Sequence, residues 1–294
     1  MSSLSNQGPI YSVELFPPKT PEGMVRLKEE VGRIVDLGPA YFSVTYGAGG
    51  STREGTFETV SWLQAQGLIA APHLACIGSS RAQIREILER YQQLGIRRLV
   101  ALRGDLPSGM GWGNTGEFRY ANELVSFVRA EFGEWFLIEV AAYPEYHPQA
   151  SSPARDLENF KRKVEAGANG AITQYFYNAD AYFHFVENCQ RLGIEIPIVP
   201  GIMPITNYAQ LARFSDICGA EIPRWIRRRL EAYGEDLDGL REFGHEVVLR
   251  LCERLMGGGA PGLHFYSMNQ AGPVLRLWRD LDLPRPRGEA AGAA

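Results

Sequence analysis

The sequence lacks the features of several common protein classes. Its 294 residues include four cysteines, which are far apart and form no C-x-x-C pair, so a structural zinc site is not expected. We interpret the cysteines as reduced thiols of a cytoplasmic protein. No apolar run is long enough to span a membrane, and the first ten residues lack the basic start and apolar stretch of a secretory signal.

Charge and composition narrow the classes further. A formal net charge of −4 provides no general basic surface, so nucleic acid is not an expected partner. Hydrophobic residues make up 45% and charged residues 22% of the chain, which is the balance of an ordinary globular protein. The length suits one large domain or two small ones.

Short apolar segments alternate with helical segments along the chain. Eight segments have strand character: 11–16, 41–46, 72–77, 99–102, 136–143, 171–177, 197–204 and 262–268. Helices are expected between them, since Thr20 before Pro21 and Ser80 before Gln83 are typical helix starts. Prolines in the seventh segment disfavour regular pairing there.

This alternation predicts an α/β fold, a (β/α)8 TIM barrel. We expect a single domain over 1–294, with 1–9 and 284–294 as loose tails and extra helices at 208–255, between strands seven and eight. A doubly wound open sheet is the alternative. It would need a G-x-G-x-x-G turn after an early strand, and the glycine-rich stretch 47–50 lacks that spacing.

Polar residues follow the fourth strand, which reads as buried on both faces. Arg103, Gly104 and Asp105 come after its apolar run, and Pro107 prevents further pairing. Barrels bind their ligands at the carboxyl ends of the strands. Other strand ends supply further polar side chains, namely Glu14, Thr45, His73, Tyr143 and Gln174.

Glu14 is the candidate general acid. It lies inside an apolar strand, where a carboxylate without a partner is costly and tends to keep its proton. That property suits proton donation. A structural ion pair, for example with Arg103, is an equally acceptable interpretation, and for His73 a hydrogen-bonded core role is favoured over catalysis.

The helix expected at 153–166 carries a polar stripe beside its apolar one. Asp156, Asn159 and Lys163 form this stripe at helical spacing. Such a stripe can reach a ligand laid across the barrel mouth, although an ordinary solvated helix face would look the same.

The strand ends contain no cluster of metal ligands, no Ser-His-Asp signature and no nucleophile elbow. These absences favour an organic cofactor that carries out the chemistry itself. A lyase acting through a Schiff base would need a lysine inside a strand, but all four lysines are expected in loops or helices: Lys19, Lys28, Lys161 and Lys163. A non-catalytic binding barrel is the other alternative.

Seven sequence blocks resemble those of a known family, the FAD-dependent 5,10-methylenetetrahydrofolate reductases of the bacterial single-domain type. The resemblance runs from about Ser12 to about Gln270. The blocks are Val13–Lys19, Val44–Gly50, Ala101–Asp105, Val140–Glu145 with His147-Pro148, Gly167–Asn169 leading to Ile172–Gln174, Pro200–Pro204, and His264–Tyr266. Together, in this order and spacing, they are highly specific.

The resemblance implies a barrel that holds FAD at the carboxyl ends of its strands. It implies a ping-pong hydride transfer in which NADH or NADPH reduces the flavin, and methylenetetrahydrofolate then takes the hydride to give 5-methyltetrahydrofolate. This reaction belongs to one-carbon metabolism and methionine supply. Relatives are homo-oligomers, so a dimer or tetramer is expected, without a regulatory domain.

The family's site residues transfer to matching positions of this chain. Glu14 matches the acid that protonates the folate N10, and Asp105 matches a carboxylate near the flavin that stabilises the resulting cation. The resemblance places these residues at the FAD site: Thr45, Tyr46, His73, Arg103, Gly104, Asp105, Tyr120, Ala121, Tyr143, His147, Asp156, Asn159, Arg162 and Lys163. It places these residues at the folate site: Glu14, Thr45, Gln174, Gln210, Phe214 and Gln270.

One position departs from the family pattern. Where many relatives have an arginine shortly after the His-Phe-Tyr block, this chain has Gln270. A glutamine cannot pair with a carboxylate as a guanidinium does, so recognition of the folate glutamate tail at this position is in doubt.

Overall fold

A computed structural model describes residues 8–46, 51–104 and 116–285 of the chain. These residues form nine strands and ten helices. The strands are β1 (Ile10–Leu15), β2 (Tyr41–Val44), β3 (Ala70–Ala75), β4 (Arg98–Leu102), β5 (Leu137–Ala142), β6 (Gly170–Thr173), β7 (Ile198–Val199), β8 (Gly201–Ile202) and β9 (Gly262–Tyr266). The helices are α1 (Pro21–Val35), α2 (Ser51–Ala65), α3 (Arg81–Gln93), α4 (Ala121–Phe132), α5 (Pro153–Glu165), α6 (Ala179–Arg191), α7 (Tyr208–Cys218), α8 (Arg224–Ala232), α9 (Leu237–Gly257) and α10 (Ala271–Asp280).

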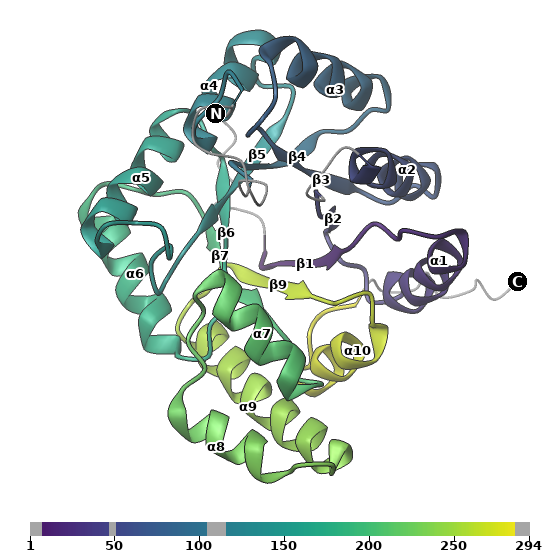
Figure 1. The fold of residues 1–294 in the computed structure, drawn as a ribbon, viewed down its shortest axis with the longest axis vertical. Coiled ribbons are helices and arrows are strands. Elements are labelled where there is room, and N and C mark those ends of the chain that lie inside the picture. Colours follow the sequence, from purple (N-terminus) through teal and green to yellow (C-terminus); the bar gives the residue numbers. More distant parts are fainter. Residues whose placement is uncertain (1–7, 47–50, 105–115, 286–294) are drawn as a thin grey trace, which may run out of the picture.

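The strands form one parallel barrel. Their order is β7-β6-β5-β4-β3-β2-β1-β9-β8, and the two end strands are consecutive in the chain, so the order closes on itself. Helices surround the strands, and α8 and α9 extend the molecule beyond this ring (Figure 1). The predicted TIM barrel and its extra helices between strands seven and eight are therefore confirmed.

The seventh strand differs from the prediction. In place of one strand over 197–204, β7 and β8 each contain two residues and are separated by Pro200. Proline cannot donate a ladder hydrogen bond, but the Pro200 carbonyl still accepts from the His264 backbone N–H at 2.9 Å. The sixth strand also ends earlier than predicted, at Thr173, and the aromatic run that follows it packs into the core.

The helix-start patterns formed as predicted. Thr20 caps α1 through its side chain, and Ser80 and Gln83 form a complete capping box at α3. Ser152 caps α5 in the same way, with Pro153 in the first turn. These local caps satisfy backbone N–H groups that have no partner within the helix.

The barrel has two packed layers of different character. A large apolar cluster fills the space between strands and helices, whereas the apolar cluster inside the barrel contains only four buried residues, Tyr41, Ala71, Val100 and Ile172. Polar side chains occupy much of the remaining interior, including Ser12, Glu14, Ser43, Glu139 and His264. The barrel interior is thus a polar site as well as a core.

The seam between β1 and β9 is unusually close at Gly262. Its φ of +147° disfavours other residues, and a Cβ at this position would lie 1.8 Å from the Ile10 carbonyl oxygen. The close approach sets the register that pairs Glu14 with Tyr266. No helix within the described ranges combines the length and hydropathy needed to cross a membrane.

Candidate active site

Glu14 lies near the carboxyl end of β1, points into the barrel and is 5% exposed. Two histidines approach the same oxygen of its carboxyl group. His73 Nε2 on β3 is 3.4 Å from Glu14 Oε2, and His264 Nε2 on β9 is 3.5 Å from it. The partners of Glu14 are therefore imidazoles. The ion pair with Arg103 that we considered is not formed, because Arg103 donates to Gly104 and Gln149.

Burial favours the neutral form of His73. Desolvation lowers its pKa below the ordinary value, although the nearby Glu14 carboxyl acts in the opposite direction and His264 adds to the lowering. Its Nε2 has no hydrogen-bond partner among the described residues. His73 therefore lies beside the candidate acid Glu14, whereas the sequence analysis favoured a hydrogen-bonded histidine of the core.

His264 is fully buried and held from several sides. Its Nδ1 lies 2.7 Å from the Ser12 hydroxyl, and its Nε2 lies 3.5 Å from the Ser43 hydroxyl. The ring stacks against Tyr41 at a centroid distance of 6.3 Å and meets the edge of Tyr266 at 5.3 Å. These contacts fix the orientation of the ring.

An ion pair lies deeper in the barrel, beneath His264. The Tyr41 hydroxyl donates to Glu139 Oε1 at 2.9 Å, and Arg98 Nη1 lies 3.2 Å from the same oxygen. The Arg98 guanidinium also covers the Tyr41 ring at 4.3 Å. Burial and the Glu139 charge raise the pKa of Tyr41 well above its ordinary value, so this phenol keeps its proton.

A second cluster lies at the ends of β4 and β5 and on the first turns of α5. Arg103 Nη2 donates to Gln149 Oε1 at 2.7 Å, and the His147 backbone N–H donates to Asp156 Oδ2 at 3.0 Å. The rings of Tyr143 and His147 meet at 4.6 Å. The structure thus brings together four of the residues expected at the cofactor site, namely Arg103, Tyr143, His147 and Asp156.

Lys163 is a partly buried cation of this cluster. Its Nζ donates to the Ala141 carbonyl at 2.5 Å, and burial lowers its pKa to about 8, with Asp156 acting in the opposite direction. Lys161, on the same helix, pairs with Glu165 at 3.7 Å, whereas no carboxylate of the described chain forms such a pair with Lys163. The ammonium is therefore available to an anion.

Gly104 follows β4 where this strand approaches β3. Its φ is +86°, and a Cβ would lie 2.9 Å from the Ala75 Cβ. Only glycine adopts this conformation without strain, so Gly104 allows the chain to turn directly after Arg103.

The remaining sequence-predicted residues occupy strand ends and the helices that follow them. Thr45 and Tyr46 follow β2, Tyr120 precedes α4 and is 51% exposed, and Ala121 begins that helix. Asn159 and Arg162 lie on α5, Gln174 follows β6, Gln210 and Phe214 lie on α7, and Gln270 immediately precedes α10. Asp105 lies outside the described residues.

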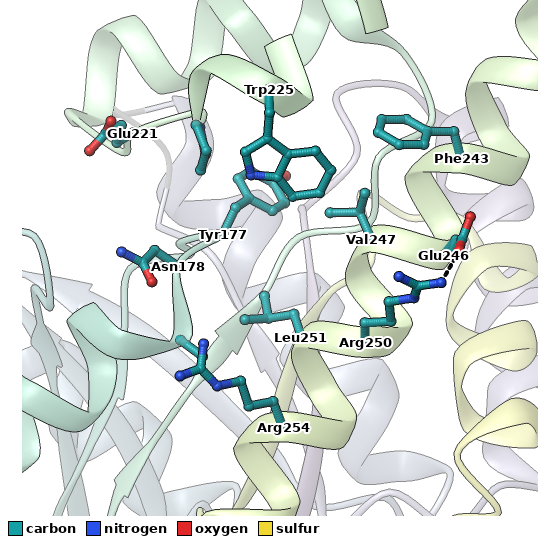
Figure 2. A pocket seen from close by; sticks show the side chains of 12 residues that line it. Tyr177, Asn178, Glu221, Trp225, Phe243, Glu246, Val247, Arg250, Leu251 and Arg254 are labelled. Atoms are coloured by element: carbon teal, nitrogen blue, oxygen red, sulfur yellow. Dashed lines mark hydrogen bonds and ion pairs between the residues drawn. The ribbon is translucent and has the colours of Figure 1, made fainter. Parts of the chain in front are cut away.

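A groove of about 550 Å³ lies elsewhere, between the start of α6 and helices α8 and α9. Trp225, Tyr177 and Phe243 gather at one side of it, and Arg250 and Arg254 project from α9 (Figure 2). The described residues that line it include none of those expected at the active site. This groove is therefore separate from the residues that the sequence predicts for the active site.

Comparisons with known proteins identify the family of the chain. A sequence model described as methylenetetrahydrofolate reductase matches residues 1–282. The chain belongs to the methylenetetrahydrofolate reductase family. It is 40% identical to a 5,10-methylenetetrahydrofolate reductase of Escherichia coli, covering 90% of this chain and 88% of the relative. It is 36% identical to a maize methylenetetrahydrofolate reductase (NADH), of which it spans 48%.

A solved structure supports the fold. A Clostridium thermocellum protein, described as binding two copies of 5-methyl-5,6,7,8-tetrahydrofolic acid, superimposes with a TM-score of 0.63 at 16% identity, covering 90% of each chain. At this identity the match concerns the fold alone. The reaction named by the family, reduction of methylenetetrahydrofolate, is supported by the sequence relatives.

Several site residues were not singled out from the sequence. The sequence indicates His264 only as part of a family block, and it predicts no site role for Ser12, Tyr41, Arg98 or Glu139. A signal was present, since polar residues alternate with apolar ones along β1 and β9, as in Ser12-Val13-Glu14 and His264-Phe265-Tyr266. This alternation marks the inward face of a polar barrel.

Proposed function

We propose that the protein reduces 5,10-methylenetetrahydrofolate to 5-methyltetrahydrofolate with NADH or NADPH, by ping-pong hydride transfer through FAD. The observation that carries this proposal is the buried Glu14 carboxyl, which lies beside two imidazoles near the end of a barrel strand. A carboxyl group at this end of a barrel, where ligands bind, would serve as the general acid of the reaction.

The donor set at the ends of β4 and β5 fits FAD. Lys163 is a partly buried ammonium that forms no ion pair with a carboxylate of the described residues, and it suits a diphosphate. Arg103 after β4 and Arg162 on the same helix as Lys163 add positive charge. Asp156 suits a ribose hydroxyl. When bound, FAD supplies the hydride transfer from nicotinamide to folate that no side chain performs.

The chain's own residues would supply the acid chemistry. Glu14 would donate its proton to N10 of the folate, which opens the five-membered ring to an iminium ion. Asp105, which lies outside the described residues, would stabilise that cation. Thr45, Gln174, Gln210 and Phe214 would orient the pterin and the benzoyl part of the substrate.

The proposal includes a cellular setting. The protein would work in the cytoplasm as a homodimer or homotetramer, in one-carbon metabolism and methionine supply. Support comes from the family membership of the chain, and its four cysteines form no disulfide.

Cofactor identity provides the first test. The purified protein, or protein reconstituted with flavin, is treated with acid, and the released compound is identified by chromatography. We expect FAD; FMN alone would contradict the assignment of Asp156 and Lys163 to the adenylate half. A protein that binds no flavin and reduces no methylenetetrahydrofolate would instead be a binding barrel.

A further inference from the structure

The loop that joins β9 to α10 contains two successive residues with left-handed backbone conformations. Met268 has a φ of 52° and Asn269 has a φ of 56°. Such values are unfavourable for residues other than glycine, although asparagine tolerates them better than methionine. They persist where the surrounding structure holds them, and they cluster at functional sites. The contacts of this loop therefore indicate what it does.

Both polar atoms of the Asn269 side chain contact one residue, Phe16, which directly follows β1. The Asn269 Oδ1 accepts from the Phe16 backbone N–H at 2.8 Å, and the Asn269 Nδ2 donates to the Phe16 carbonyl at 2.8 Å. The carboxamide thereby replaces a neighbouring strand at this position. Backbone pairing cannot continue along the chain, because Pro17 and Pro18 follow Phe16 and have no N–H to donate.

Ser267 contacts the same part of the chain at Glu14. Its buried hydroxyl donates to the Glu14 backbone carbonyl at 2.5 Å and accepts from the Asn269 backbone N–H at 3.1 Å. The loop thus holds the main chain on both sides of Leu15, at Glu14 and at Phe16. These contacts lie at the seam where β1 and β9 run side by side (Figure 1).

The loop is also anchored at its other end. The Ala271 backbone N–H, at the start of α10, donates to Glu30 Oε2 on α1 at 2.5 Å. The hydrogen bonds to Phe16, Glu14 and Glu30 together tie this loop to β1 and to the helix that follows it. The strained conformation of the loop is therefore held from two elements.

The main chain is important for the Glu14 carboxyl, because the imidazoles beside this carboxyl are not close. His73 Nε2 and His264 Nε2 lie 3.4 and 3.5 Å from Glu14 Oε2, which exceeds the usual length of an N–H···O hydrogen bond. Glu14 is the penultimate residue of β1, so a shift of the strand end moves its carboxyl directly. A displacement of about 1 Å can slow a reaction step about a hundredfold.

We propose that Ser267 and Asn269 are positioning residues, which hold Glu14 through the main chain of β1 where its carboxyl reaches the substrate. The clamp consists of their hydrogen bonds to Glu14 and Phe16. The proposal rests on the proposed function, because that function makes Glu14 the general acid. The left-handed backbone at Asn269 is then the conformation that the clamp holds in place.

Asn269→Gly tests the clamp, because glycine adopts the left-handed conformation without strain and lacks the carboxamide. At saturating methylenetetrahydrofolate, reoxidation of the reduced enzyme should slow by about tenfold to a hundredfold. Flavin reduction by the nicotinamide should stay within a few-fold. A raised KM for the folate with a normal limiting rate would show that the loop only binds substrate, and it would overturn the proposal.

Asp282→Gly is the matched control. Asp282 also has a positive φ, of 49°, but it is exposed and lies beyond the far end of α10. This substitution should leave both half-reactions at the wild-type rate. An equal loss of the folate half-reaction in Asp282→Gly and Asn269→Gly would show that the effect is not specific to the clamp, and it would overturn the proposal.

A double-mutant cycle separates positioning from general stabilisation. If Asn269 acts through Glu14, Asn269→Gly should cause no further loss in the folate half-reaction when Glu14 is already glutamine. Losses that multiply in the double variant would overturn the proposal. Ser267→Ala should slow the same half-reaction, and Ser267→Thr, which keeps the hydroxyl, should retain the wild-type rate. A normal rate in Ser267→Ala would remove Ser267 from the clamp.

Hydrogen–deuterium exchange tests the clamp without catalysis. The Phe16 amide donates to Asn269, so it should exchange about tenfold faster or more in Asn269→Gly and at the wild-type rate in Asp282→Gly. Equal exchange in the wild type and in Asn269→Gly would overturn the proposal. A wild type that does not reduce methylenetetrahydrofolate would overturn the proposed function instead, and the exchange rates would still show whether the clamp exists.

Discussion

The two halves of the barrel mouth are constructed differently. The acid half consists of inward side chains on β1, β3 and β9, and its members are 0–8% exposed: Ser12, Glu14, His73 and His264. The cofactor half lies largely within one strand–loop–helix unit, from Ala141 to Lys163, with Arg103 from the preceding strand. One half is assembled from the two ends of the chain, and the other mostly from neighbouring residues.

The two halves also differ in the partners that their polar and charged side chains have. In the acid half, the His264 ring contacts the Ser12 and Ser43 hydroxyls, so the orientation of this ring is set within the protein, although His73 Nε2 has no hydrogen-bond partner among the described residues. In the cofactor half, the described residues offer the partly buried Lys163 ammonium a carbonyl and a more distant carboxylate, so a bound anion would complete the site. We expect the function of the acid half to respond most to changes in the shape of its side chains. We expect cofactor binding in the other half to respond most to changes in charge.

The largest effect is expected from Glu14→Gln. The amide keeps the size of the side chain but cannot donate a carboxylic proton. Reoxidation of the reduced enzyme by methylenetetrahydrofolate should fall by roughly 10²–10⁴, while reduction by NADH or NADPH should stay within a few-fold. Anaerobic stopped flow that follows the flavin colour measures both rates. Loss of FAD or misfolding would mean that Glu14 has a structural role, and two normal rates would remove it from the mechanism.

Gly262→Ala tests whether the acid half depends on barrel closure. An alanine Cβ would meet the Ile10 carbonyl carbon and oxygen, so the seam between β1 and β9 must open. We expect a loss of roughly 3 kcal/mol or more in the free energy of unfolding, measured by urea denaturation. Gly193→Ala is the matched control, because Gly193 also has a positive φ but no atom within 4 Å of the new Cβ. Its cost should be about 1 kcal/mol, and equal losses in the two variants would show that the close contact is unimportant.

Lys163→Gln tests the cofactor half. A neutral amide keeps a hydrogen bond to Ala141 but removes the charge, so FAD affinity should fall by about tenfold to a hundredfold, as for loss of a charged hydrogen bond. Titration of the apoprotein with FAD measures this. The acid half around Glu14 should be unaffected by this substitution. An unchanged affinity would mean that the diphosphate lies elsewhere.

The pH dependence of Lys163 has a defined sign. Its pKa in the folded protein is lowered to about 8, so raising the pH through this value removes the charge before it is lost in the unfolded chain. FAD binding should weaken as the pH rises through about 8, whereas stability of the apoprotein should rise between about pH 8 and the ordinary lysine pKa. Lys163→Gln should flatten both profiles, and a wild type that binds FAD equally at pH 7 and pH 9 would contradict the assignment.

The smallest effect is expected from Gln270→Arg. Gln270 is exposed at the start of α10, and a guanidinium there could pair with the folate glutamate tail. Exposed ion pairs contribute about 0–1 kcal/mol, so the KM for polyglutamylated folate should fall only a few-fold, with flavin reduction unchanged. An unchanged KM would show that the tail is held elsewhere.

The sequence by itself determined the parts of this protein that depend on neighbouring residues. The alternation of strands and helices, the helix caps at Thr20 and Ser80, and the polar stripe on α5 were all predictable, because each depends on a local period or on a hydrogen bond within one turn. Glu14 was recognisable as a carboxyl group within an apolar strand. The division of the seventh strand at Pro200 was not predicted, since proline disfavours pairing without saying where pairing resumes.

Only the tertiary structure decided what surrounds Glu14. Ser12 and His264 are separated by 252 positions, and the register between β1 and β9 places them side by side. The sequence suggested Arg103 as the partner of Glu14, and the barrel supplied two histidines. The physical reason is that a barrel closes by pairing its first strand with its last. Which inward side chains meet therefore depends on strand register and tilt, and no local pattern along the chain contains that information.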